Sequence, residues 1–112
     1  DWIHSHGTGS QANDLAEGVA IRQLFGEKHP LVTSTKSLHG HMLGGSGLLE
    51  SLLSIEALKF GRPIEHLKPR EPDPKIPLNW DFSEFRPLKA LVKTTLGFGG
   101  NNSAIVITRD TQ

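Results

Sequence analysis

The chain has 112 residues, which is enough for one small domain or for part of a larger one. Its twelve basic and twelve acidic residues cancel, so there is no basic excess that would favour a nucleic-acid partner. It contains no cysteine, which excludes disulfides, thiolate metal sites and a cysteine nucleophile within this chain. No apolar run approaches the roughly 20 residues of a membrane span, and no signal peptide is visible, so we expect a cytoplasmic protein without a membrane segment.

The first third of the chain predicts a strand, a helix and a second strand. Residues 2–5 alternate loosely like a short strand and lead into a turn of small residues. Asp14 and Glu17 have the spacing of a capping box, and apolar residues follow at helical spacing, which predicts a helix over about residues 13–25. Gly26 ends this helix. The short β-branched run at residues 31–35 predicts a buried strand.

The rest of the chain predicts one broad helix, an extended loop and two strands. Residues 36–47 are rich in glycine and histidine, and residues 48–58 form an apolar helix that could begin as early as residue 41. Its apolar face is too wide for a surface helix, so we expect it to be buried on most sides. Residues 62–77 hold five of the seven prolines and predict an extended surface loop. The strand-like runs 90–96 and 103–108 flank a glycine-rich turn at residues 97–102.

This order of elements predicts a single α/β unit with a mixed sheet over residues 1–112. The chain begins with Asp1 rather than methionine, which indicates a piece of a longer polypeptide or a processed chain. Three segments at the ends of predicted strands concentrate unusual residues, and strand ends are where α/β proteins usually build their sites. These segments are residues 6–10, 36–47 and 97–102.

Two histidine pairs, His4 with His6 and His39 with His41, have the His-X-His spacing that can bind a metal ion. No carboxylate or cysteine lies at a typical ligand spacing from them, so the pattern does not favour zinc. The glycines of residues 97–102 lack the spacing of a dinucleotide fingerprint. Taken singly, none of the three segments therefore specifies an activity.

Together the three segments resemble the β-ketoacyl synthases. Residues 6–10, with Glu17 behind them, resemble the first histidine motif of that family. Residues 34–50 resemble its lysine and second histidine motif, and residues 97–102 resemble its final glycine-rich motif. The resemblance implies a thiolase-like α/β fold, in which two similar halves form an α-β-α-β-α sandwich. It further implies that this chain is most of the second half and that the nucleophilic cysteine belongs to the first.

The resemblance also assigns roles to individual residues. His6 and His41 would be the catalytic imidazoles that stabilise the enolate oxygen when a malonyl thioester loses carbon dioxide. Lys36 would be the active-site lysine, with an organising electrostatic role and Glu50 as its partner. Two further pairs complete the assignment: Phe98 and Gly99 as the gating and supporting segment, and Thr8 and Ser10 as hydroxyls that bind the pantetheine arm.

The resemblance implies decarboxylative condensation in fatty-acid or polyketide synthesis, without a bound cofactor or metal. The phosphopantetheine would belong to an acyl carrier protein, and the other partners would be the cysteine-bearing half or subunit and a second copy in a dimer. Two alternatives stay open at this stage: a non-catalytic chain-length-factor-like subunit, and a carrier-protein-binding or metal-binding module. Because the histidines, Lys36 and Phe98 are retained, the pattern favours the enzyme. The acyl chain length does not follow from the sequence.

Overall fold

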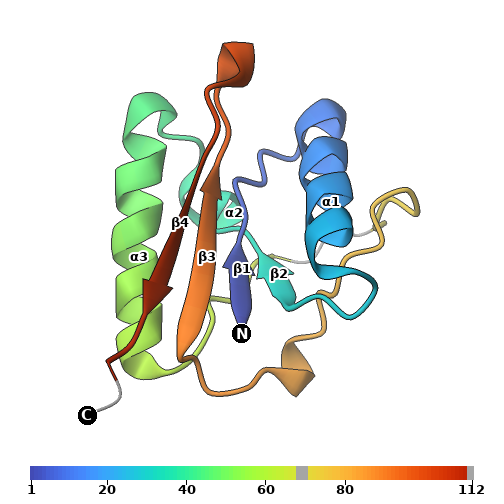
Figure 1. The fold of residues 1–112 in the computed structure, drawn as a ribbon. Helices are drawn as coiled ribbons and strands as arrows, with labels where there is room; N and C mark the ends of the chain where they lie inside the picture. Colours follow the sequence, from blue (N-terminus) through green and yellow to red (C-terminus); the bar gives the residue numbers. More distant parts are fainter. Residues whose placement is uncertain (68–70, 111–112) are drawn as a thin grey trace.

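A computed structural model describes residues 1–67 and 71–110. Within these residues, one sheet has four strands in the order β2-β1-β3-β4 (Figure 1). Strand β1 pairs in parallel with both β2 and β3, and β3 pairs antiparallel with β4. The mixed α/β sheet predicted from the sequence is therefore confirmed. The strands are β1 (Trp2–His4), β2 (Leu31–Thr33), β3 (Ala90–Thr95) and β4 (Ser103–Thr108).

Three α-helices accompany the sheet: α1 (Gln11–Phe25), the short α2 (Lys36–His39) and α3 (Ser46–Phe60). Alternating residues of β1 divide the core into two clusters, because side chains two apart on a strand face the same side. Trp2 packs with Ala57 and Leu58 of α3, whereas Ile3 packs with Ile21 of α1. Helices α1 and α3 therefore cover opposite faces of the sheet, and the loops that follow β1 and β2 lie between them.

The start of α1 differs from the sequence-based prediction. The helix begins at Gln11, and Ser10 is its N-cap, with the Ser10 Oγ accepting a hydrogen bond from the Asn13 backbone N–H at 3.3 Å. The capping box predicted for Asp14 and Glu17 is wrong, because Glu17 turns away from the helix terminus toward the backbone of the preceding loop. The predicted end of the helix at Gly26 is confirmed, and Gly26 has a φ of 74°.

The region between β2 and α3 is more helical than predicted. Residues 36–39 form α2, and a 3₁₀ turn at Leu43–Gly45 leads directly into α3. Helix α3 is buried along Glu50, Ser54 and Ala57, but Leu48 and Leu52 are exposed in this chain. The prediction that α3 would be buried on most sides is therefore wrong for the chain by itself. The face of the helix that packs on the sheet is polar at Glu50 and Ser54 and apolar at Ala57, and the apolar face with Leu48 and Leu52 is open.

The remaining predictions differ little from the structure. Strand β4 has the predicted bounds, β3 is one residue shorter, and β2 ends at Thr33. The turn between β3 and β4 contains a 3₁₀ turn at Phe98–Gly100, in which Gly99 has a φ of 75°. In the proline-rich stretch, the described residues 62–67 and 71–77 contain no helix or strand, as expected for an extended loop. The part of that prediction that falls on residues 68–70 lies outside the described residues.

Candidate active site

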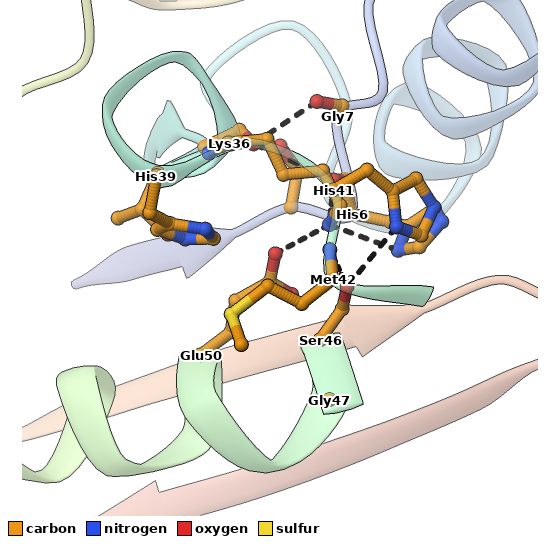
Figure 2. Close-up of polar contacts among 12 residues, drawn as sticks. His6, Gly7, Lys36, His39, His41, Met42, Ser46, Gly47 and Glu50 are labelled. Atoms are coloured by element: carbon orange, nitrogen blue, oxygen red, sulfur yellow. Dashed lines mark hydrogen bonds and ion pairs between the residues drawn. The ribbon is translucent and has the colours of Figure 1, made fainter. Parts of the chain in front are cut away.

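His6 and His41 are 35 positions apart in the sequence, yet their rings meet in the structure. The ring centroids lie 5.4 Å apart, and the ring planes are nearly perpendicular at 86° (Figure 2). His6 lies in the loop after β1, and His41 lies between α2 and α3. Both loops leave the carboxyl ends of neighbouring parallel strands, which is why they meet at one edge of the sheet. His6 is buried at 4% exposure, whereas His41 is exposed.

Hydrogen bonds determine which nitrogen of each ring carries the proton. The His41 Nδ1 lies 3.0 Å from the Leu43 backbone N–H, and the His6 Nδ1 lies 3.3 Å from the Lys36 Nζ. A backbone N–H and an ammonium group can only donate, so both Nδ1 atoms accept. The rings are therefore neutral with the proton on Nε2, and each offers one Nε2–H donor. Burial, followed by the positive charge of Lys36, lowers the pKa of His6 and favours this neutral form.

Lys36 connects the first histidine to a buried carboxylate. Its Nζ donates to the His6 carbonyl oxygen at 2.6 Å and forms an ion pair with Glu50 Oε1. The other oxygen of Glu50 lies 2.8 Å from the Nζ of Lys93. Burial pushes the pKa of Glu50 up, but hydrogen bonds from Lys36 and Lys93 outweigh it, so this pKa lies below its usual value. The structure thus confirms the predicted Lys36–Glu50 pair and adds a second lysine to it.

The histidine pairs that suggested a metal site have other partners. His4 is fully buried between the Ser54 hydroxyl at 2.7 Å and the Thr35 hydroxyl at 3.0 Å. His39 contacts the same Thr35 hydroxyl at 2.8 Å and the Gly40 carbonyl oxygen at 2.7 Å. Over residues 1–67 and 71–110, no three histidine, aspartate or glutamate side chains are grouped as a metal ion would require. The metal-binding alternative therefore has no ligand set in the described part of the chain.

The buried His4 makes the stability of the protein depend on pH. Desolvation, followed by the charges of Lys93, Lys36 and His39, lowers the pKa of His4 from 6.5 to about 2. Below pH 6.5 the unfolded chain binds a proton that the folded chain excludes, so stability is lost as the pH falls from 6.5 toward 2, by up to about 1.4 kcal/mol per pH unit.

We expect His4→Gln to weaken this dependence. Urea unfolding of the complete protein between pH 7 and pH 4 measures it, and the variant should lose less stability than the wild type over this range. Equal slopes for the two proteins would show that His4 is not the group that titrates.

Comparisons with known proteins agree with this geometry. A model of the β-ketoacyl synthase C-terminal domain matches residues 1–67. The chain is 35% identical to 3-oxoacyl-[acyl-carrier-protein] synthase 2 of Coxiella burnetii, over 97% of this chain and 27% of that protein. The fold matches a solved ishigamide ketosynthase/chain length factor with a TM-score of 0.90 and 29% identity, over 99% of this chain and 28% of that one.

The chain belongs to the β-ketoacyl synthase family. The chain also matches one chain in a solved complex of a type II PKS acyl-carrier protein with its ketosynthase, with a TM-score of 0.87 and 28% identity, over 96% of this chain and 27% of that one. These structures also confirm the expected thiolase-like fold. The chain spans about a quarter of the length of the curated synthases that it matches, so this part of a β-ketoacyl synthase holds only part of the machinery. No helix among the described residues has the length and apolar character to cross a membrane.

Glu17, which the sequence placed with the first histidine motif, supports the site in a way that the predicted capping box did not indicate. Its carboxylate accepts hydrogen bonds from the backbone N–H groups of His6 at 2.8 Å and Gly7 at 2.7 Å, and from the Thr94 hydroxyl at 2.8 Å. It therefore fixes the loop that carries His6. A helical pattern could have indicated this, because Glu17 is one turn before the buried Ile21 and faces the sheet with it.

Gly7 allows the His6 loop to lie against the end of β2. Its φ is 47°, and a Cβ atom at this position would be 2.4 Å from the Ser34 Cβ, which is too close. The Ser34 hydroxyl donates to the Gly7 carbonyl oxygen at 3.1 Å. A side chain at Gly7 would push the loop away from Ser34 and displace His6.

The other predicted site residues lie outside the histidine cluster. Thr8 and Ser10 place their hydroxyl oxygens 3.1 Å apart at the start of α1, where Ser10 also caps the helix. The Phe98 side chain is fully exposed, at 103%, in the turn between β3 and β4. Gly99, with its left-handed backbone, lies beside it. The pantetheine-binding role of the hydroxyls and the gating role of Phe98 and Gly99 remain predictions.

Proposed function

We propose that the protein containing this chain catalyses decarboxylative Claisen condensation of a malonyl carrier-protein thioester with an acyl thioester. The observation that carries this proposal is the pair of Nε2–H donors on His6 and His41, in contact across 5.4 Å between centroids. When the malonyl group loses carbon dioxide, the electrons of the broken C–C bond move into an enolate, and negative charge develops on the thioester oxygen. Two fixed donors at that oxygen stabilise the developing charge.

Condensation itself needs a cysteine nucleophile, and this chain contains no cysteine. In the proposed reaction, a cysteine from the other half or from a partner subunit holds the acyl group as a thioester. The enolate carbon attacks the acyl carbonyl, a C–C bond forms, and the cysteine thiolate leaves. The neutral imidazoles stabilise charge without accepting a proton, so their Nε2–H tautomer matters more than their charge.

The proposed partners follow from the same chemistry. One matched structure holds an acyl-carrier protein in complex with its ketosynthase, which supports an acyl carrier protein as the donor of both thioesters here. Its phosphopantetheine arm would pass the Thr8 and Ser10 hydroxyls, and Phe98 with Gly99 would gate its entry. We extend the family resemblance to a dimeric enzyme in the cytoplasm.

The test uses the complete protein, supplied with acyl and malonyl carrier-protein thioesters. We expect carbon dioxide release together with a 3-oxoacyl product, detected by mass spectrometry. A chain-length-factor-like subunit would release carbon dioxide only after an active partner synthase is added. The proposal would be refuted if neither carbon dioxide nor 3-oxoacyl product formed once the cysteine-bearing half was present.

A further inference from the structure

Lys93 is a fully buried lysine for which the reaction described above has no use. It lies on β3 two positions after Leu91 and faces α3 with it, at 1% exposure. Its Nζ forms an ion pair with Glu50 Oε2 at 2.8 Å and donates to the Thr94 carbonyl oxygen. Removing an ammonium group from water costs several kcal/mol, and a single ion pair repays that cost only in part. The free energy of folding alone therefore gives little reason for a lysine at this position.

The charges around His6 suggest a different reason. Among the described residues, the charged groups that act on His6 are two lysines, Lys36 and Lys93, and two glutamates, Glu17 and Glu50. These four charges cancel, and His41, whose ring contacts His6, is neutral. Without Lys93, one lysine would face two carboxylates, and the surroundings of His6 would be negative. A negative site would repel both a malonyl carboxylate and an enolate, and would favour protonation of His6.

The geometry connects Lys93 to His6 through two intermediate groups. Lys93 holds one oxygen of Glu50, Lys36 holds the other, and the Lys36 Nζ reaches the His6 Nδ1 at 3.3 Å. Because Lys93 also neutralises Glu50, Lys36 can donate one of its N–H hydrogen bonds to the His6 Nδ1. That contact is what places the His6 proton on Nε2.

We propose that Lys93 is a positioning residue: it balances the negative charge of Glu50 near His6 and so keeps His6 a neutral Nε2–H donor. This inference rests on the proposed function, because it concerns the same histidine pair. It differs from a purely structural role, in which Lys93 would only neutralise Glu50 in the folded protein. The two roles predict different pH profiles.

The experiment measures malonyl decarboxylation against pH in the complete enzyme, for the wild type and for Lys93→Met. Lys93 lowers the pKa of His6, so its removal raises that pKa. Since decarboxylation requires neutral His6, the acid limb of the profile should move to higher pH. Lys59→Met serves as the matched control, because Lys59 is also paired to a glutamate on α3 but is exposed. Its profile should coincide with that of the wild type.

A double variant separates charge balance from structure. Lys93→Met combined with Glu50→Gln removes one positive and one negative charge, so the acid limb should return toward its wild-type position. This variant also carries the test if Lys93→Met alone fails to fold. The inference is overturned if the acid limb does not move in Lys93→Met, or if it stays displaced in the double variant. A wild-type enzyme without decarboxylation would instead overturn the proposed function, and this inference with it.

Discussion

Replacing either His6 or His41 by alanine should lower the rate of condensation by about 100-fold to 1,000-fold, equivalent to about 3–4 kcal/mol of lost transition-state stabilisation. The physical reason is that each ring supplies one Nε2–H donor, with its Nδ1 already engaged by Lys36 or by the Leu43 backbone. Transfer of the acyl group to the cysteine should be largely unaffected, because that step forms no enolate. Stopped assays that measure acylation and carbon dioxide release separately would check both statements.

The conservative variants His6→Gln and His41→Gln serve as controls for this prediction. A glutamine amide keeps an N–H donor, so these variants should lose less activity than the alanine variants do. If either alanine variant condensed acyl and malonyl groups at the normal rate, its histidine would not be a donor to the enolate. If acylation fell in parallel with condensation, the fault would lie in folding or in substrate entry.

Glu50→Ala should cause the largest loss of stability of any single substitution in this region. Glu50 has 0% exposure and is the shared partner of two buried lysines. Its removal leaves Lys36 and Lys93 as neighbouring buried cations without a counter-ion. Breaking a buried ion pair in this way typically costs about 3–5 kcal/mol. Urea unfolding of the complete protein would measure this change in the free energy of unfolding.

Glu56→Ala is the matched control for that experiment. Glu56 lies on the same helix and pairs with Lys59, but both side chains are exposed. Its loss should change the free energy of unfolding by at most about 1 kcal/mol. If the two variants lost similar amounts of unfolding free energy, the buried ion pairs of Glu50 would stabilise the protein no more than an exposed pair does.

The sequence predicted the residues of the histidine site more completely than the residues that support them. Motifs that follow strands identified His6, Lys36 and His41, and the structure brings them together because parallel strands deliver their ends to one edge of the sheet. Lys93 was not predicted, because a lysine in a strand is usually solvent-exposed. Alternation from Leu91 would have placed Lys93 on the buried side.

Two further errors have a different origin. Glu17 was assigned to a capping box because its spacing from Asp14 fitted, but three donors from the His6 loop and β3 compete for its carboxylate. Leu48 and Leu52 were expected to be buried, but both are exposed. The local pattern shows how wide the apolar face of a helix is, and it does not show what packs on that face. In both cases tertiary contacts decided the outcome. The helical pattern can place Glu17 on the side of the sheet, but it does not show which donors Glu17 meets there or what packs on Leu48 and Leu52.

The most direct test of the account is a crystal structure of the complete enzyme with a malonyl thioester analogue that does not decarboxylate. We expect the thioester carbonyl oxygen to lie about 3 Å from the Nε2 atoms of both His6 and His41. We also expect the Nδ1 atoms to keep their contacts with Lys36 and the Leu43 backbone. A carbonyl oxygen bound by neither ring, or rings that present Nδ1 to it, would contradict the central claim.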